Sequence, residues 1–222
     1  MPAGAGKTEL AQALFGVDPW STGDAHLDGR SIHYHSPRQA IKLGMGFLPE
    51  DRDSDGLCLN MGVKENLTLV QLAKMRSTFF GVAQERRRAN ELISAIDIKT
   101  SGLSQQVKYL SGGNKQKVVF GKWLGAKCNL LILDEPTIGI DVGARQEIYD
   151  LIRAFVDEGD HGVIFISSDM AEILDVADRI LVMSNARIVA DLNPKEATQQ
   201  SLMAYSVRGS KQSEATKERI EQ

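Results

Sequence analysis

The sequence predicts an α/β fold: a parallel β-sheet with flanking helices, a small antiparallel β region and an inserted helical subdomain. Short apolar runs alternate with helical stretches in the C-terminal half, and a hairpin pattern with a glycine turn lies near the N-terminus. Strand patterns are absent from Leu57 to about Leu110. With 222 residues, the chain is long enough for one domain that carries a small subdomain.

The N-terminal elements are predicted from turn and capping residues. After Thr8, the stretch ELAQALFG has helical propensity and ends at Gly16, a suitable C-terminal cap. The stretch AHLDGRSI predicts two short strands joined by an Asp-Gly turn. The stretch SPRQAIKLG predicts a helix with Ser36 as its N-cap and proline in its first position. Lys7 and Thr8 are therefore expected at a helix N-terminus, where anions bind.

The middle and C-terminal regions differ in character. From Leu57 onward strand patterns disappear, and ERRRANELISAI has apolar residues at helical spacing, which predicts a helical subdomain over about residues 57–125. Beyond it, NLLILDE, GVIFISSD and DRILVMS are short apolar runs separated by helical stretches, the pattern of buried parallel strands with crossover helices. Residues 209–222 are polar and charge-rich, which predicts a disordered tail after a domain over residues 1–208.

Composition restricts the classes of partner and compartment. A formal net charge of -3 leaves no broad basic surface, so no nucleic acid partner is expected. Cys58 and Cys128 lack C-x-x-C spacing, which argues against a disulfide framework or a zinc site and favours a reducing cytoplasm. No apolar run approaches the roughly 18 residues that cross a bilayer, so we expect the chain itself to be soluble.

The first residues, MPAGAGKT, fit the phosphate-binding pattern G-x-x-x-x-G-K-[ST] with Met1 where the first glycine belongs. Gly4 and Gly6 would let backbone N–H groups face phosphate, Lys7 supplies positive charge, and Thr8 offers a hydroxyl to Mg²⁺. Taken alone, a flexible glycine-rich N-terminus explains these residues equally well.

A second motif supports the phosphate-loop interpretation. In NLLILDEPTIGID, an apolar strand delivers Asp134 and Glu135 to its carboxyl end, the edge where ligands bind in open α/β sheets. Asp134 can hold Mg²⁺ through water, and Glu135 can polarise the water that attacks a γ-phosphate. Two ordinary surface carboxylates are the alternative, and the upstream loop disfavours it.

A third motif lies in YLSGGNKQKVVFGKWLGAK. Ser111, Gly112 and Gly113 open a predicted helix, and Ser111 is explained equally by a simple N-cap with a glycine turn. The alternative is a second anion site, formed by a helix N-terminus, glycines and a hydroxyl. Because the helical insertion separates this site from the phosphate loop, the two are expected to serve different nucleotides.

Together, these motifs resemble the ATP-binding domain of ABC transporters, which has a P-loop NTPase-type fold. GAGKT resembles Walker A, LSGGNKQK the ABC signature, LLILDEP Walker B and GIDVGAR the D-loop. More narrowly, GFLPEDRDSDGL, DEPTIGIDVGARQEIYDLI and ISSDM resemble the second ATP-binding half of the tandem ATPase subunits in ribose-type sugar importers. The resemblance implies ATP hydrolysis, with ATP and Mg²⁺ as cofactors.

The resemblance also implies roles for particular residues. Glu135 is expected to be catalytic, and Thr8 and Asp134 are expected to hold the metal. The residues expected to contact nucleotide, in this chain's own site or in a partner's, are Gly4, Ala5, Gly6, Lys7, Thr8, Glu50, Ser111, Gly112, Gly113, Asn114, Asp141 and Ser168.

Two positions depart from the family's pattern. The family places a glutamine after the strand that MGFLP would form, and this chain has Glu50, which could bind the metal but would repel the γ-phosphate. The family places a histidine where this chain has Ser168, and serine is too short to reach that phosphate. These departures argue against hydrolysis at this chain's own loop and leave ATP binding as the expectation.

The resemblance further implies partners. ABC ATP-binding domains pair head to tail, so that ATP held by one Walker A loop is clamped by the signature of the other. We therefore expect a second ABC ATPase domain, an integral membrane sugar permease and, indirectly, a periplasmic or extracellular sugar-binding protein, at the cytoplasmic face of the cell membrane. The helical insertion from Leu57, with Glu50 and the segment after it, would face the permease. Ser111, Gly112 and Gly113 would then matter more to turnover than Glu135.

The same residues also bear on other classes of function. A non-catalytic half that binds ATP and donates its LSGGN signature to a partner stays open. The acidic balance disfavours an ATPase acting on DNA or the ribosome, and NKQK lacks the aspartate of a guanine-reading N-K-x-D. Because the chain starts inside the Walker A pattern, we expect the strand before the loop and a first ATPase half upstream. We also expect the isolated chain, with two unpaired sheet edges, to be marginally stable.

Overall fold

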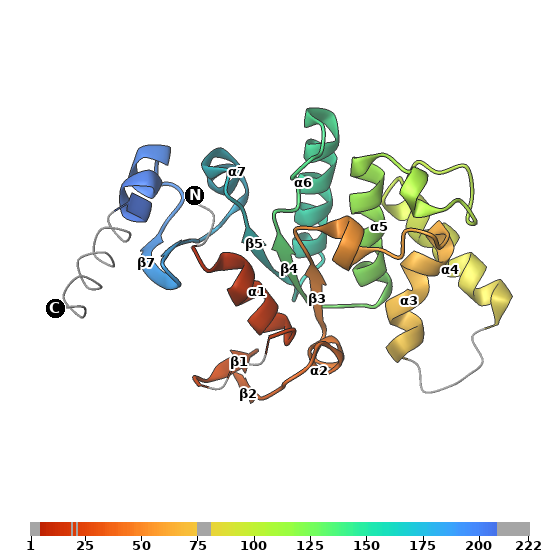
Figure 1. Cartoon of the computed structure of the whole chain (residues 1–222), viewed down its shortest axis with the longest axis horizontal. Helices are drawn as coiled ribbons and strands as arrows, with labels where there is room; N and C mark the ends of the chain where they lie inside the picture. The colour runs from red at the N-terminus through yellow and green to blue at the C-terminus, as the bar shows by residue number, and fades with distance from the viewer. Residues whose placement is uncertain (1–4, 19, 21, 75–80, 208–222) are drawn as a thin grey trace.

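The computed structural model describes residues 5–18, 20, 22–74 and 81–207. Figure 1 shows a small central sheet with helices packed around it and a group of helices to one side. The central sheet consists of three parallel strands in the order β3 (Met45–Leu48), β4 (Leu130–Asp134) and β5 (Gly162–Ile166). The predicted α/β class with a parallel sheet is confirmed.

Several helices lie near the central sheet. They are α1 (Lys7–Phe15), α2 (Pro37–Lys42), α6 (Val142–Asp157) and α7 (Met170–Val176), with a π-helical turn η1 (Arg52–Gly56) after β3. Helix α1 packs on β3 and β4, and α6 packs on β5. Helix α1 ends as predicted at Gly16, whose φ of 79° is the left-handed conformation that glycine tolerates.

The predicted antiparallel region is confirmed as a hairpin of β1 (Ala25–Leu27) and β2 (Arg30–Ile32). The helices between β3 and β4 form the group at the side of Figure 1. They are α3 (Val63–Lys74), α4 (Val82–Ala95), the 3₁₀ turn η2 (Val107–Tyr109) and α5 (Gly112–Gly125), and they fall within the expected subdomain range. The expected tail at 209–222 lies outside the described residues.

The larger of two apolar core clusters among the described residues joins the sheet to these helices. Leu131 and Ile132 of β4 are fully buried, and Trp123 of α5 contacts Phe15 of α1 edge to face, with ring centroids 5.6 Å apart. Helix α5 thereby contacts both the sheet side and the helical side of the core. No helix among the described residues combines the length and hydrophobicity needed to cross a bilayer.

The prediction that DRILVMS joins the parallel sheet is wrong. This segment forms β6 (Ile180–Ser184), which pairs antiparallel with β7 (Arg187–Leu192) in a separate two-stranded sheet. Asn185 and Ala186 between them have φ values of 50° and 56°, the geometry of a two-residue hairpin turn. Because the turn is short, β6 pairs with β7, the strand that follows it in the sequence. It does not pair with β5, and a groove of about 230 Å³ lies between β6 and β5.

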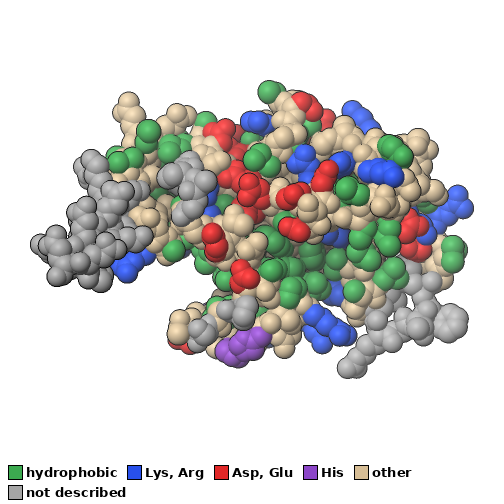
Figure 2. Space-filling model, in the orientation of Figure 1, with side chains coloured by type: hydrophobic (Ala, Val, Ile, Leu, Met, Phe, Trp, Pro, Cys, Tyr) green, Lys and Arg blue, Asp and Glu red, His purple; other side chains and the backbone are tan. Residues whose placement is uncertain are grey.

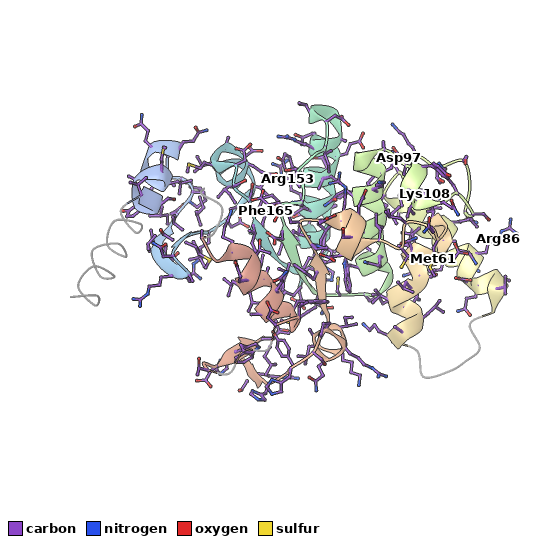
Figure 3. All side chains as sticks on the ribbon, viewed as in Figure 1. Met61, Arg86, Asp97, Lys108, Arg153 and Phe165 are labelled. Atoms are coloured by element: carbon purple, nitrogen blue, oxygen red, sulfur yellow. The ribbon has the colours of Figure 1, made fainter. Side chains whose placement is uncertain are left out.

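The groove between β5 and β6 is mainly apolar. Phe165 of β5, labelled in Figure 3, lines it together with Val163 from the same strand and Leu181 from β6. Leu181 is 46 % exposed. Strand β5 is consequently an edge of the parallel sheet in the described part of the chain.

Candidate nucleotide site

The loop that leads into α1 is fixed on the turn between β6 and β7. The carbonyl of Ala5 accepts a hydrogen bond from the Ala186 amide at 3.0 Å. Gly6 has a φ of 86°, and a Cβ at this position would lie 2.8 Å from the Cα of Ala186. Only glycine fits both the conformation and the close approach. Helix α1 then begins at Lys7, as the phosphate-loop interpretation requires, while Gly4 lies outside the described residues.

Lys7 connects the start of α1 to the carboxyl ends of two strands. Its Nζ lies 3.4 Å from Glu135 Oε1 and donates a hydrogen bond to the Ser167 carbonyl at 3.2 Å. The amide of Glu135 in turn donates to the carbonyl of Ile166 at 2.9 Å. A helix N-terminus and an ammonium group thus meet at one sheet edge, an arrangement that attracts phosphate.

Asp134 is a buried carboxylate at the end of β4. The residue is 0 % exposed, and neither of its side-chain oxygens accepts a hydrogen bond from the described residues. Burial raises the pKa of this carboxyl, and the charges of Glu50 and Glu135 add to the increase. The Thr8 side chain offsets part of this increase in pKa, although it makes no hydrogen bond of normal geometry to Asp134.

The residues at this edge fit Mg²⁺. An ionised carboxylate without donors is costly in a buried position, and a divalent cation would compensate its charge. A cavity of about 570 Å³ opens beside Asp134, and Thr8 and Glu50 also line it. Figure 2 shows acidic side chains gathered near the centre of this face of the molecule. The Thr8 hydroxyl and the Asp134 carboxylate are oxygen ligands of the kind that Mg²⁺ takes together with nucleotide phosphates.

Removing the charge of Asp134 tests this interpretation. Because burial raises its pKa above the ordinary 3.8, the folded state favours the protonated form, and its ionisation reduces stability as the pH rises. Without divalent cations at pH 7, Asp134→Asn is expected to increase the free energy of unfolding by about 1–3 kcal/mol. The gain should disappear as the pH falls below 3.8, where wild-type Asp134 is protonated in both states.

Urea denaturation at several pH values measures this effect. Asp160→Asn changes an exposed aspartate in the same way and should leave stability nearly unchanged. Adding MgATP should make the wild-type protein more stable than Asp134→Asn, because only the wild-type protein has the carboxylate that would bind the metal. A variant that is less stable than wild type at pH 7 without divalent cations would contradict the assignment.

The start of α5 is a capped helix N-terminus with an exposed hydroxyl. Ser111 is exposed, and its Oγ accepts hydrogen bonds from the Asn114 amide at 3.5 Å and from Asn114 Nδ2 at 2.8 Å. Asn114 Oδ1 accepts from the amide of Lys99 at 2.7 Å. The N-cap interpretation of Ser111 is confirmed, and its exposure leaves the hydroxyl accessible to a partner.

Two glycines let this helix approach the loop that follows β4 and the first turn of α6. A Cβ at Gly113 would lie 2.7 Å from Ala144 Cβ, and one at Gly112 would lie 3.1 Å from the carbonyl of Gly139. Asp141, in the same loop, caps α6 by accepting the Ala144 amide at 3.0 Å. Side chains larger than glycine would push the start of α5 away from this loop.

The structure brings together some of the predicted site residues and leaves others apart. Lys7 and Glu135 are in contact, with Asp134 next to them, whereas Ser111 and Asn114 contact each other at the start of α5. Ser168 is exposed and is the second residue after β5. These positions are consistent with two separate sets of residues in one chain.

Sequence reasoning missed three residues near this edge. Ser167 supplies the carbonyl that binds Lys7, and the rule that strand ends meet at one edge could have found it. Arg52 donates from Nη1 to the Ile138 carbonyl at 2.8 Å, and Glu172 lies buried behind the edge. No local sequence signal marks Arg52 or Glu172 for these positions.

Fold and site together define a P-loop nucleotide-binding domain with a second, signature-like helix N-terminus. The family described as ABC transporter matches residues 2–138. Two solved structures share the fold: a nucleotide-free ATP-binding cassette from an ABC transporter (TM-score 0.73, 19 % identity, 86 % of this chain and 78 % of that one), and a dimeric post-hydrolysis cassette bound to ADP and Pi (TM-score 0.74, 19 % identity, 87 % and 82 %).

Curated relatives give a narrower similarity. The chain is 44 % identical to ribose import ATP-binding protein RbsA 1 of Rubrobacter xylanophilus over 93 % of its length and 42 % of the relative. It is 45 % identical to RbsA 1 of Streptomyces avermitilis over 92 % of its length and 39 % of the relative. The chain therefore spans about two fifths of the length of these relatives. It belongs to the ABC transporter family, and the predicted resemblance is confirmed.

Proposed function

We propose that this chain is the ATP-binding component of an ABC importer for ribose-type monosaccharides. In this function it couples the binding and hydrolysis of ATP to transport through a separate membrane permease. The observation that carries the proposal is the contact of Lys7 with Glu135, beside the buried Asp134, in a chain 41–45 % identical to ribose import ATP-binding proteins. A sugar-binding protein outside the membrane would deliver the substrate to the permease.

Different residues at the sheet edge would contact different parts of the bound nucleotide. Lys7 and the first amides of α1 would bind the terminal phosphates, and Thr8 and Asp134 would hold Mg²⁺. When bound, the metal neutralises phosphate charge and orients the phosphates for transfer. Glu135 now contacts Lys7, so an arriving γ-phosphate competes for the same ammonium group and releases the carboxylate to accept a proton from water.

The start of α5 would serve a nucleotide in the opposing ATPase domain. Ser111 is exposed at a helix N-terminus, which supports a hydroxyl and amide contact with an anion from outside the chain. The first helical turn is held by its close packing on Gly139 and Ala144. Head-to-tail pairing would then place this turn against the terminal phosphate that the partner domain holds.

A second candidate function is a non-catalytic half that binds ATP and completes the partner's site. It is favoured by Glu50, which lines the cavity as an exposed carboxylate, and by the short side chain of Ser168 after β5. Hydrolysis is measured for the chain alone and then with a complete ABC ATPase domain. Activity of the chain alone supports its own site as catalytic, whereas activity only in the mixture supports the second candidate.

The transport role is tested by association with the membrane partner. We expect the chain, produced together with its ATPase partner and a ribose-type permease, to be recovered with the permease from detergent extracts. Crosslinks to the permease should come from the η1 segment that follows Glu50 and from the helical region from Leu57 onward. A chain that never associates with an integral membrane protein would contradict the proposal.

A further inference from the structure

We propose that Glu172 is a positioning residue that holds the loop after β4 against the end of β5 and thereby sets the position of the groups around Lys7. Its effect on nucleotide rests on the proposed ATP-binding function. Glu172 is on α7, is 6 % exposed and does not line the cavity next to Asp134. It would therefore act through other residues and not by touching substrate.

Three hydroxyl groups from different parts of the chain donate to this one carboxylate. Thr137 Oγ1 and the Tyr149 hydroxyl donate to Glu172 Oε1 at 2.6 Å and 2.8 Å, and Ser167 Oγ donates to Oε2. Thr137 belongs to the loop after β4, Tyr149 to α6, and Ser167 to the end of β5. One buried charge thus fixes three elements that are far apart in sequence.

The contacts of Ser167 extend this connection to the phosphate loop. The Ser167 carbonyl accepts the hydrogen bond from Lys7 at 3.2 Å, and its Oγ accepts from the Asp169 amide at 3.0 Å. If the Glu172 carboxylate is lost, the Ser167 side chain loses a strong acceptor, and its backbone is free to shift with Lys7. The expected consequence is a less well-defined site for the terminal phosphates.

The contacts of Thr137 extend the connection in the other direction. Its neighbour Ile138 accepts a hydrogen bond from Arg52 Nη1 at 2.8 Å, which joins this loop to η1. Lys115 of α5 is bonded to Asp53 of η1 at 2.6 Å. The loop that Glu172 holds is therefore connected to both the phosphate loop and the first turns of α5.

A carboxylate suits this position better than an apolar side chain. Burial and the hydrogen bond to Glu172 raise the pKa of Tyr149, so its hydroxyl stays protonated and donates. Both carboxylate oxygens act only as acceptors, and three donors converge on them. A leucine would leave those buried hydroxyls without an acceptor, whereas glutamine keeps the shape and removes the charge.

Amide hydrogen exchange of the whole chain without nucleotide tests the positioning role. Glu172→Gln is expected to raise exchange about tenfold or more at the amides of residues 137–140 and 167–169, because the Thr137 and Ser167 side chains lose the charged acceptor that holds these segments. The denaturation midpoint and the exchange of the α5 interior should stay near wild type. A uniform rise across the protein, or no local rise, would overturn the proposal.

Two further variants sharpen this measurement. Asp175→Asn neutralises an exposed carboxylate on the same helix and should leave the local exchange unchanged. Asp175 pairs on the surface at 3.5 Å with Arg153, which is labelled in Figure 3. Tyr149→Phe removes one donor without changing charge, and should raise exchange in the same loop by a smaller factor. If Glu172→Gln fails to fold, Tyr149→Phe tests the positioning role in its place. Unchanged amide exchange in the loop after β4 of Tyr149→Phe would then overturn the proposal.

A double-mutant cycle with a nonhydrolysable ATP analogue tests the effect on nucleotide. Glu172→Gln should weaken binding several-fold in the wild-type background and have little further effect when Lys7 is already alanine. Equal losses in both backgrounds would overturn the link to Lys7. If the wild-type chain binds no analogue, the proposed function fails, and hydrogen exchange still decides whether Glu172 positions this edge.

Discussion

Replacing Lys7 with alanine is expected to weaken ATP binding by about 10- to 100-fold, the value of a charge-assisted contact to phosphate in a partly buried site. The Lys7 side chain is only 16 % exposed, so water cannot replace it fully. Its removal also leaves Glu135 without a cation at the sheet edge, and the γ-phosphate would then meet an uncompensated carboxylate.

Isothermal titration of the chain with ATP measures this loss. Lys195→Ala removes an exposed lysine and changes the net charge by the same amount as Lys7→Ala. It should alter the dissociation constant for ATP by less than about twofold. If Lys7→Ala binds ATP as well as this control does, the loop does not bind the terminal phosphates, and the assignment of the site fails.

Ser111→Arg is expected to reduce ATP hydrolysis by the paired domains by about 100-fold or more, the cost of losing one well-placed donor to a developing charge. Ser111 is exposed at the start of α5, so an arginine there would project outward into the partner domain without disturbing this chain's core. The chain's own affinity for ATP should change little, because Lys7 and Asp134 belong to the other set of residues.

The assay uses the chain mixed with a complete ABC ATPase domain, and compares three variants. Ser104→Arg places the same side chain at another exposed serine between α4 and α5 and should preserve most of the activity. Glu135→Gln should have the smaller effect of the two site variants, because the partner's own carboxylate would act in the shared site. The opposite order, with Glu135→Gln abolishing hydrolysis and Ser111→Arg leaving it intact, would refute the assignment of roles.

Much of the sheet edge could be predicted because it depends on local rules. The apolar run before Asp134 fixed a strand, and the end of a parallel strand is where ligands bind, so the meeting of Asp134, Glu135 and Lys7 followed. The capping role of Ser111 was likewise predicted from a serine before two glycines. In each case the signal lies within a few residues of the strand end or helix start that it predicts.

Other features could not be predicted from such local signals. The run DRILVMS has the composition of a buried parallel strand, but the two-residue turn at Asn185 and Ala186 directs it into a hairpin with β7. Glu172 lies in a short helix where a charged residue normally faces water, and its buried contacts with Thr137, Tyr149 and Ser167 come from distant elements.

The sequence alone determined the α/β class, the start of α1 at Lys7 and the family to which the chain belongs, because strand ends, helix starts and phosphate-binding glycines have short-range signals. Tertiary structure decided that β6 leaves the parallel sheet and that Glu172 receives three hydroxyl donors. Both results depend on which distant elements pack together, and hydrogen-bond satisfaction in a buried site is a property of that packing.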